Sequence, residues 1–408
     1  MRILFVAHRF PYPPKSGGKI RAFNIIRHWH EQGHEVHVAS LTRNAEETAE
    51  IDGISEFCTE YETEQVGNVV AWSRMLLRLP TPVPSSMGYF YSSRLKATIR
   101  RWLEQYDFDL IFVHSSSVAQ FVEHVNNVPK VLDFCDMDSQ KWQIYSDFKP
   151  FPLSMGYLWE GVRLERDEKR LASLFDLSTV ATPAEEDTLT SFGVARATGW
   201  FPNGVDAEFF SPTDSDYESN VMTFIGRMDY YPNQHAMHTF CEDVLPRIQS
   251  EMPEAKLQIV GADPSPDIVR LGDLPGVVVT GSVPDVRPYA LKSAVTVAPL
   301  EIARGTQNKI LESMAMGVPV VCSTIAARGV DAEPGEHLLT ADEPAAFAEA
   351  VLKIMREPGV RQRFASAGRS RAVSNHSWQS ALVRLDALVE DCLGASQRSS
   401  RASTASAG

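Results

Sequence analysis

The chain has 408 residues, of which 44% are hydrophobic, and this length and composition predict two globular domains. A formal net charge of −13 excludes a general nucleic-acid binder, and no apolar run is long enough to span a membrane. Five scattered cysteines without metal spacing, and a first apolar stretch too short for a signal peptide, predict a reduced cytoplasmic protein.

The first half of the chain predicts alternating strands and helices. A strand at 3–7 leads through a polar loop to a helix at about 21–31, followed by a second strand at 36–40. Gly17 and Gly18 precede this helix, at the carboxyl end of the first strand, where ligands bind in open α/β sheets. Two glycines let backbone N–H groups approach a phosphate or sugar closely, although a flexible turn is the alternative.

Residues 65–103 carry six Lys or Arg residues and no acidic residue, in a chain that is acidic overall. Aromatic and aliphatic residues are interleaved with these cations. Such a segment suits a peripheral contact with an anionic membrane surface. The alternative is a helical excursion whose apolar residues pack on the core while its arginines face solvent.

Two further strands of this half, 110–113 and 130–134, end in polar residues that should face one cleft. His114 closes the first strand, and Asp136 and Asp138 follow the second. His114 and Asp136 are therefore candidates for orienting a substrate. The two carboxylates could instead hold Mn or Mg, or cap a helix from a solvated loop.

The alternation restarts after a polar, turn-rich stretch at 207–220, which is expected to be a linker. The strand 221–225 ends in Gly226 and Arg227, a helix is expected from 234 to 249, and further helices and strands follow to residue 375.

The most informative stretch is 294–322, which predicts a strand, a loop, a helix and a second strand. Gly305 lets the chain turn, and Thr306 can cap the helix. Gly317 ends the helix in the usual position after its last turn.

The start of this helix has the chemistry of an anion site. Its free N–H groups belong to Thr306, Gln307 and Asn308, and the positive end of the helix dipole adds to them. Lys309 contributes a full charge there, and Glu312, one turn on, can accept two hydrogen bonds from hydroxyl groups.

Residues 312–321, ESMAMGVPVV, resemble the second half of the donor-site signature of the family 4 glycosyltransferases. These are retaining enzymes with two facing Rossmann-like domains, the GT-B architecture. The first Glu of the signature falls on Arg304, so that half of the motif is missing. Residues 202–206, PNGVD, and the pair Gly226–Arg227 also match family positions.

The resemblance implies specific roles. In the family the second Glu, here Glu312, holds the donor ribose, the helix amides hold the diphosphate, and the arginine after Gly226 reaches that diphosphate. A lysine that often follows is absent, and Lys309 is expected to replace it. Predicted donor-binding residues are Gly17, Gly18, Gly226, Arg304, Gly305, Thr306, Gln307, Asn308 and Glu312, and predicted catalytic residues are Arg227, Lys309, His114 and Asp136.

The expected architecture is α/β, with two Rossmann-like domains and a C-terminal helix that crosses back to the first. Its parts are an acceptor-side domain, a linker, a nucleotide-sugar-binding domain, the crossover helix and a disordered tail, at 1–206, 207–220, 221–375, 376–393 and 394–408.

Three segments, 16–21, 133–139 and 304–312, look most like the sugar transferases found with exosortase-linked exopolysaccharide gene sets in bacteria. The resemblance implies a retaining hexosyltransferase that takes a sugar from a nucleotide-diphosphate donor to a saccharide acceptor, expected to be lipid-linked. Arg227, Lys309 and the helix amides would stabilise charge on the leaving phosphate, so no metal cofactor is expected. The expected location is the cytoplasm, with peripheral contact at the inner face of the membrane.

Three alternatives remain open. Asp136 and Asp138 look like the metal-binding pair of the other glycosyltransferase architecture, which does not carry the 305–319 signature. A sugar-nucleotide epimerase of the GT-B architecture would use the same helix start. A non-catalytic nucleotide-sugar-binding protein is conceivable because Arg304 replaces an acid that contacts the donor sugar in the family.

Overall fold

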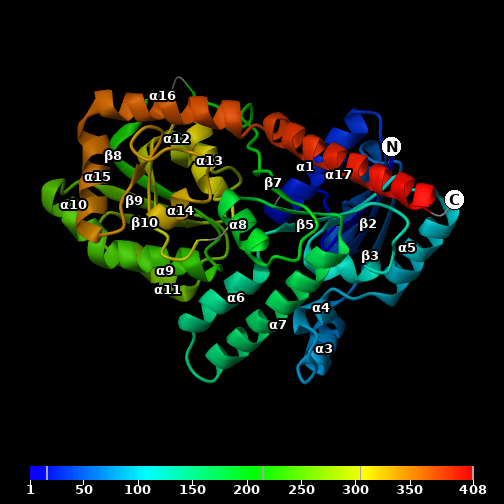
Figure 1. Ribbon diagram of the computed structural model, residues 1–408. Helices are drawn as coiled ribbons and strands as arrows, with labels where there is room; N and C mark the ends of the chain where they lie inside the picture. Colours follow the sequence, from blue (N-terminus) through cyan, green and yellow to red (C-terminus); the bar gives the residue numbers. More distant parts are fainter. Residues whose placement is uncertain (15–16, 214–215, 304, 407–408) are drawn as a thin grey trace. The chain divides into compact units, whose positions relative to one another are not determined.

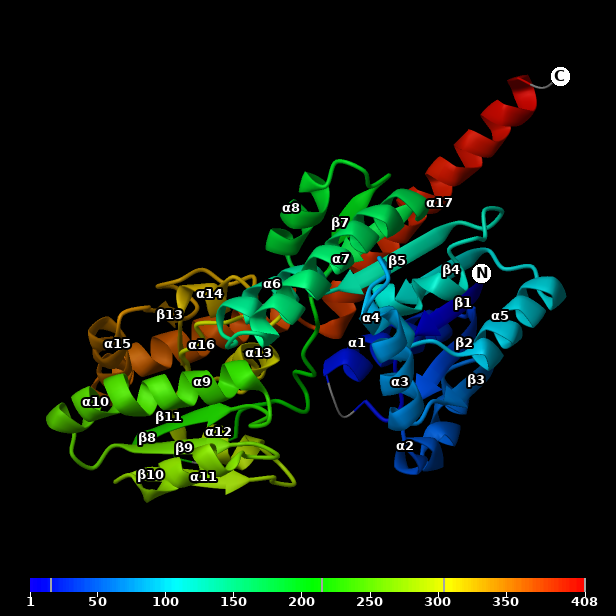
Figure 2. The ribbon, with the colours of Figure 1, turned by 90° about the horizontal axis from the view of Figure 1, so that it is seen from below.

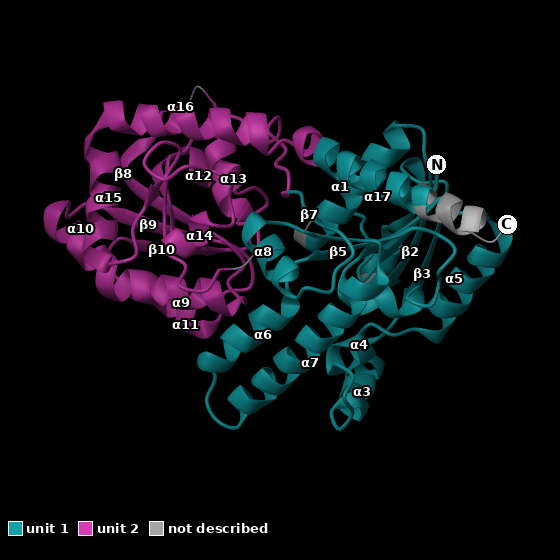
Figure 3. Ribbon diagram, viewed as in Figure 1, with its two compact units in different colours: residues 1–201, 382–408 teal, residues 202–381 magenta. Residues whose placement is uncertain are grey.

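The computed structural model describes residues 1–14, 17–213, 216–303 and 305–406, so Arg304 lies outside the described residues. The chain divides into two compact units (Figure 3). Unit 1 comprises Met1–Phe201 with Leu382–Gly408, and unit 2 comprises Pro202–Ala381. The division therefore falls five residues before the expected domain end at 206. The segment 202–206 belongs to unit 2 because Val205 donates to the carbonyl of His376 at 2.6 Å.

Unit 1 contains a seven-stranded parallel sheet in the order β3-β2-β1-β4-β5-β6-β7. This order changes direction between the neighbouring strands β1 and β4, which makes that point the topological switch where open α/β sheets bind ligands. The strands are β1 (Arg2–Ala7), β2 (Glu35–Thr42), β3 (Glu60–Gln65), β4 (Leu110–His114), β5 (Lys130–Cys135), β6 (Leu177–Val180) and β7 (Thr198–Trp200).

Helices cover both faces of this sheet (Figure 1). On one face, Trp29 of α1 packs edge-on against Phe5 and Phe112, with ring centroids 6.4 and 5.1 Å apart. The helices of unit 1 are α1 (Gly17–Glu31), α2 (Ala45–Ala49), α3 (Asn68–Arg78), α4 (Ser85–Tyr89), α5 (Ser93–Gln105), α6 (Asp138–Asp147), α7 (Leu153–Leu174), α8 (Pro183–Ser191) and most of α17 (Trp378–Ser406), with 3₁₀ turns at Ile51–Glu56 and Ser116–Phe121.

Unit 2 contains a six-stranded parallel sheet in the order β10-β9-β8-β11-β12-β13, whose switch point lies between β8 and β11. Its strands are β8 (Glu218–Ile225), β9 (Lys256–Val260), β10 (Val277–Gly281), β11 (Ser293–Ala298), β12 (Val320–Cys322) and β13 (Leu339–Thr340). Its helices are α9 (Tyr231–Thr239), α10 (Leu245–Glu251), α11 (Pro266–Arg270), α12 (Arg287–Leu291), α13 (Asn308–Ala315), α14 (Thr324–Ala327), α15 (Pro344–Arg356) and α16 (Pro358–Asn375), with a π turn at Phe240–Val244 and a 3₁₀ turn at Leu271–Asp273.

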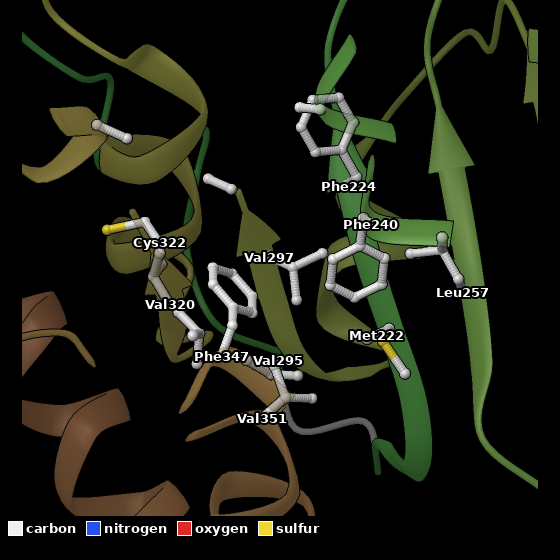
Figure 4. Close-up of a cluster of buried hydrophobic side chains, with 14 of the residues drawn as sticks. Met222, Phe224, Phe240, Leu257, Val295, Val297, Val320, Cys322, Phe347 and Val351 are labelled. Carbon is white, nitrogen blue, oxygen red and sulfur yellow. The ribbon is translucent and has the colours of Figure 1, made fainter. Parts of the chain in front are cut away.

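The core of unit 2 forms where β-branched and aromatic side chains of the sheet meet the covering helices (Figure 4). Phe240 and Phe347 pack edge-on with ring centroids 5.9 Å apart, next to Val295 and Val297 of β11. All four side chains are at most 2% exposed, so the central strands are held from the helical side by a dry apolar layer. The predicted fold class, two Rossmann-like parallel sheets, is confirmed.

Some local predictions differ from the structure. The helix expected from 234 to 249 is interrupted by the π turn Phe240–Val244, because Pro246 has no N–H to continue the regular ladder and its ring displaces the preceding carbonyl. Helix α1 begins at Gly17, so the two glycines form its first turn instead of preceding it.

The C-terminal segment also differs from its expectation. The composition of 394–408 predicts disorder, but α17 continues to Ser406. A helix that packing has already nucleated extends at little cost, because each added residue forms one more hydrogen bond. From Leu382 onward this helix belongs to unit 1, where Asp386 accepts hydrogen bonds from Trp29 at 3.1 Å and Gln32 at 2.9 Å. In Figure 2, α17 passes behind β5 of this unit. No helix in the described part of the chain is both long and apolar enough to cross a membrane.

Candidate active site

The strongest candidate site in unit 2 lies at the carboxyl ends of β8 and β11. Gly226 and Arg227 follow β8 directly, and helix α13 begins at Asn308 after the loop that leaves β11. Because the two strands are neighbours at the switch point, the residues after them converge.

Lys309 is the charged centre of this site. Its Nζ donates to Oδ1 of Asn233 at 2.7 Å and lies 4.5 Å from the centre of the Phe224 ring. Asn233, on α9, in turn donates from Nδ2 to the carbonyl of Arg227 at 2.8 Å. One amide side chain therefore connects the end of β8 to the first turn of α13 and fixes the position of the lysine.

Two glycines make this close approach possible. A Cβ on Gly226 would lie 2.7 Å from Nδ2 of Asn233 and 3.2 Å from Nζ of Lys309. A Cβ on Gly261, after β9, would lie 1.7 Å from the carbonyl oxygen of Gly226. A side chain at position 261 would displace the backbone at the end of β8, and one at position 226 would displace the side chains of Asn233 and Lys309. Gly226 therefore contributes space to the site.

Lys309 and Glu312 stand one turn apart on α13 in a poorly solvated environment. Burial lowers the pKa of Lys309 to about 7, a shift that the charge of Glu312 opposes. Burial also raises the pKa of Glu312 to about 7, and here the charge of Lys309 opposes the shift. Both charged forms are thus disfavoured by desolvation, and a ligand that supplied a negative group to the lysine and hydroxyl donors to the carboxylate would restore them.

Arg227, which is predicted to reach a diphosphate, pairs with two carboxylates in the structure. Its side chain is 61% exposed, and its guanidinium contacts Asp229 and Asp263, each at 2.7 Å. Exposed ion pairs of this kind contribute little free energy, so an anionic ligand can compete for the arginine.

The start of α13 also departs from expectation. The N-cap is Gln307 instead of Thr306, and its side chain makes no capping hydrogen bond. Oγ1 of Thr306 is buried and has no hydrogen-bond partner among the described residues. The first amides of an α-helix have no intrahelical acceptor, so this end of α13 directs N–H donors toward the region of Lys309. Gly305 has φ of +62°, as expected for a turn, and Asn308 accepts from Nδ2 of Asn203 at 3.5 Å.

A second cluster, in unit 1, surrounds Asp133 at the switch point. Arg21 of α1 binds this carboxylate through two nitrogens, at 2.9 and 3.0 Å, and Thr179 donates to it at 3.0 Å. Arg21 also donates to the carbonyl of Phe201 at 3.1 Å. Burial alone would raise the pKa of Asp133, but the charge of Arg21 and the hydrogen bonds from His114 and Arg21 hold it well below the usual value.

His114 belongs to this cluster. It is 1% exposed, with Nδ1 at 3.0 Å from Oδ2 of Asp133 and Nε2 at 3.2 Å from the carbonyl oxygen of Gly18. Both neighbours are acceptors, so both contacts are hydrogen bonds when the ring carries a proton on each nitrogen. The imidazole therefore connects the carboxylate to the first turn of α1, and its nitrogens are occupied by the protein.

The carboxylates at 136 and 138 lie outside these contacts. Helix α6 begins at Asp138 with Met137 as its N-cap, so neither aspartate is the cap. Burial raises the pKa of both carboxyl groups. In the described part of the chain, the grouping with metal-ligand spacing is His114, Asp133 and Cys135, but Arg21 occupies both oxygens of its carboxylate.

Sequence reasoning placed Lys309, Glu312, Gly226 and the start of α13 in one region, and the structure brings them together. It missed Asn233, Asp133 and Arg21. The strand sequence VLDFC did contain a signal, because an aspartate inside an apolar strand needs a partner when it is buried.

Comparisons with known proteins agree with this geometry. Residues 15–209 match the family described as Glycosyltransferase Family 4, and residues 219–357 match Glycosyl transferases group 1. Phosphatidyl-myo-inositol mannosyltransferase of Mycobacterium leprae is 28% identical over 318 residues, which is 74% of this chain and 78% of that protein.

Two solved structures show the same fold. Sucrose-phosphate synthase from Thermosynechococcus elongatus has a TM-score of 0.69 at 16% identity, covering 97% of this chain and 100% of the other. The Anabaena protein HepE in complex with UDP has a TM-score of 0.65 at 16% identity, covering 96% and 100%. The two family matches together span most of both units, so the chain is a glycosyltransferase with the GT-B fold that matches Glycosyltransferase Family 4 in its N-terminal half and Glycosyl transferases group 1 in its C-terminal half.

Proposed function

We propose that this protein transfers a sugar from a nucleotide-diphosphate donor to a hydroxyl group of a saccharide acceptor, with retention of configuration at the anomeric carbon. The observation that carries the proposal is the position of Lys309, which Asn233 holds in the first turn of α13. A diphosphate bound there would accept hydrogen bonds from helix amides and neutralise a lysine whose pKa burial has lowered to about 7.

Bond breaking in such a transfer builds negative charge on the β-phosphate of the leaving nucleotide. Lys309 and the amides of α13 are fixed before the reaction, so they can stabilise this charge without reorganisation. One preorganised donor of this kind contributes about 3–4 kcal/mol in the transition state. With Arg227 released from its two carboxylates as a further cation, the reaction needs no metal ion.

Glu312 is assigned to the ribose of the donor. Its carboxylate lies one turn from Lys309 on the same helix, and burial raises its pKa to about 7. Hydrogen bonds from two ribose hydroxyls would stabilise the ionised form. HepE, a protein of the same fold, was solved with UDP, which makes uridine a first nucleotide to test.

The acceptor is proposed to be a lipid-linked saccharide in exopolysaccharide biosynthesis, processed at the inner face of the cytoplasmic membrane. The name of the M. leprae relative describes transfer of mannose to a phosphatidyl lipid, which supports an acceptor of amphipathic character. The association with exosortase-linked gene sets rests on the three short sequence segments described above.

A panel of UDP, GDP, ADP and TDP sugars in a thermal-shift assay tests the donor site. The matching donor should raise the melting temperature of the wild type, because a ligand that binds only the folded state stabilises it. Glu312→Gln should reduce this shift, since loss of a charge-assisted hydrogen bond weakens binding by about 1.5–3 kcal/mol. A shift that is unchanged in this variant would contradict the assignment of Glu312.

The donor found in this way should release nucleoside diphosphate in the presence of EDTA when an acceptor is supplied. Turnover of the donor without acceptor would favour an epimerase instead. Binding without transfer across a panel of saccharide acceptors would favour a nucleotide-sugar-binding protein.

A further inference from the structure

Exposed large apolar side chains gather in two segments of unit 1. Seven lie in 69–83, on α3 and the loop after it, and six lie in 148–159, before and within the first turns of α7; together they are more than half of such side chains in the described part of the chain. Leu77 is 75% exposed and Phe151 is 78% exposed. Isolated exposed apolar residues are ordinary, but a concentration of this size marks an interaction surface.

The structure separates two helices that the sequence had joined in one basic and apolar segment. The apolar face of α5, formed by Leu95, Ile99 and Trp102, is at most 1% exposed and packs in the core. Its cations face solvent, so α5 is a helix that packs its apolar face on the core, the alternative to a membrane contact. In α3, by contrast, the apolar side chains are the exposed ones, and among its residues only Ala71 is buried.

Two buried charged residues of α7 hold the α3 segment in place. Nη1 of Arg163 lies within hydrogen-bonding distance of the carbonyl oxygens of Leu79 (3.1 Å), Thr81 (2.9 Å) and Val83 (3.3 Å). Arg163 also pairs with Glu160, which accepts from the amides of Ser85 and Ser86 at 3.1 and 2.9 Å.

This clamp makes the exposed surface a rigid feature of the fold. Arg163 and Glu160 are only 2% and 3% exposed, and burying a charged pair is costly unless hydrogen bonds compensate for the lost water. Here Nη1 and Nη2 of Arg163 and both oxygens of Glu160 are hydrogen-bonded, while Nε of Arg163 has no partner among the described residues. The clamp also fixes the loop after α3 against α7, so the two exposed segments form parts of one surface. In Figure 1, α3 and the first half of α7 lie on the same side of unit 1, opposite α1 and α17.

The charge of these two segments is complementary to an anionic bilayer. Residues 69–83 contain Arg74 and Arg78, residues 148–159 contain Lys149, and neither segment contains Asp or Glu, although the chain carries a net charge of −13. Trp72 and Trp159, 53% and 56% exposed, supply the amphipathic rings that favour the interface between water and lipid.

The surface also lies toward the substrate edge of unit 1. Helix α3 begins three residues after the carboxyl end of β3, and α7 leads into the amino end of β6, so its first turns point toward the carboxyl edge. With 22 residues, α7 is about 33 Å long, longer than the strands it covers, which span about 20 Å. His114 and Gly18 lie at the same edge.

We propose that the exposed side chains of 69–83 and 148–159 insert into the headgroup region of an anionic lipid bilayer, with α3 and the start of α7 as the docking surface. The role of this contact, bringing a lipid-linked saccharide to the carboxyl edge of unit 1, rests on the proposed function. The docking itself does not depend on it.

Cosedimentation with vesicles of phosphatidylcholine mixed with phosphatidylglycerol tests the proposal. The wild type should pellet with these vesicles, and more weakly with phosphatidylcholine alone. The double variant Leu77→Ser, Phe151→Ser should need about tenfold or more lipid for half-maximal binding, because each change removes a large apolar group from the interface. A matched control, Leu274→Ser with Val278→Ser, changes two exposed apolar residues of unit 2 and should bind as the wild type does.

Several results would overturn the proposal. The first is that the wild type does not pellet with the vesicles, and the second is that the Leu77/Phe151 variant pellets as well as the wild type does. The third is that the control variant loses as much binding as the Leu77/Phe151 variant. Light scattering after gel filtration gives a further check: a wild-type dimer that this variant dissociates would assign the surface to a second copy of the chain. Nucleotide-sugar binding and transfer to a soluble acceptor should persist in both variants, so failure of the docking proposal is distinguishable from failure of the proposed function.

Discussion

The protein stabilises the buried charge of Asp133 in unit 1 with several partners, but it stabilises the charge of Lys309 in unit 2 only partly. Asp133 receives two hydrogen bonds from Arg21, one from Thr179 and one from His114, and its pKa is held well below the usual value. Lys309 has a neutral amide as its hydrogen-bonding partner, and burial lowers its pKa to about 7. A satisfied charge network fixes a framework, whereas a charge that the protein leaves poorly compensated is poised for a ligand.

The comparison predicts that a substitution at Asp133 mainly lowers stability, whereas a substitution at Lys309 mainly lowers activity. Asp133→Asn should reduce the free energy of unfolding of unit 1 by about 3–5 kcal/mol, because it leaves the Arg21 charge buried without a counter-ion. Urea denaturation followed by circular dichroism measures this loss. The donor-induced thermal shift should persist, since the donor site belongs to unit 2. A denaturation midpoint equal to that of the wild type would show that the network is not a framework.

Lys309→Met makes the corresponding change in unit 2. Turnover should fall about 10²–10³-fold, because the lysine acts where negative charge develops, while KM for the donor should rise less. The urea midpoint should stay the same or rise, since the variant removes a poorly solvated charge. Comparing kcat, KM and the midpoint separates the two roles. A large loss of stability with normal kcat would mean that Lys309 stabilises the fold and does not act in the reaction.

Lys309 and Glu312 should change their protonation when the donor binds, so binding should take up or release protons. At pH 8, Lys309 is mostly neutral, and a bound diphosphate raises its pKa, so binding takes up close to one proton. At pH 6, Glu312 is mostly protonated, and ribose hydroxyls stabilise its ionised form, so binding releases a proton. The net exchange should therefore change sign near pH 7.

Titration calorimetry of a nucleotide-sugar in buffers of different ionisation enthalpy measures this exchange. The diphosphate of a nucleotide-sugar is fully ionised at both pH values, so it contributes no protons of its own. Lys309→Met should lose the uptake at pH 8 and keep the release at pH 6. The same sign at both pH values would mean that one of the two residues does not face the donor.

The smallest effect is expected at Arg227. Its ion pairs with Asp229 and Asp263 are largely exposed, and such pairs typically contribute less than about 1 kcal/mol. Asp263→Asn should therefore strengthen donor binding by no more than about fivefold, as measured by the same calorimetry. A loss of donor affinity in this variant would indicate that Asp263 positions the arginine instead of competing for it.

The sequence predicted what depends on local pattern. The alternation of apolar strands and amphipathic helices predicted both sheets, because each element buries one face against the next. Lys309 and Glu312 were placed together because three residues on a helix bring two side chains to one face. The predicted start of α1 was wrong by a few residues and the predicted N-cap of α13 by one, because the ends of helices depend on contacts with other segments.

The sequence did not predict contacts between distant segments. Asn233 lies 76 residues from Lys309, and Asp133 lies 112 residues from Arg21, so no local pattern connects either pair. The sequence also did not show that α3 exposes its apolar face while α5 buries its own, since the two helices contain similar residue types. Only packing distinguishes the two helices.

The transfer reaction itself tests the central claim most directly. With the donor selected by thermal shift, NMR of the product formed in the presence of EDTA gives the anomeric configuration, and a coupled assay counts the nucleoside diphosphate released. We predict the same anomeric configuration in donor and product, with one nucleoside diphosphate for each sugar transferred and none without acceptor. An inverted product, or turnover that requires added Mn or Mg, would contradict the assignment of Lys309 and the start of α13 as the group that stabilises the leaving diphosphate.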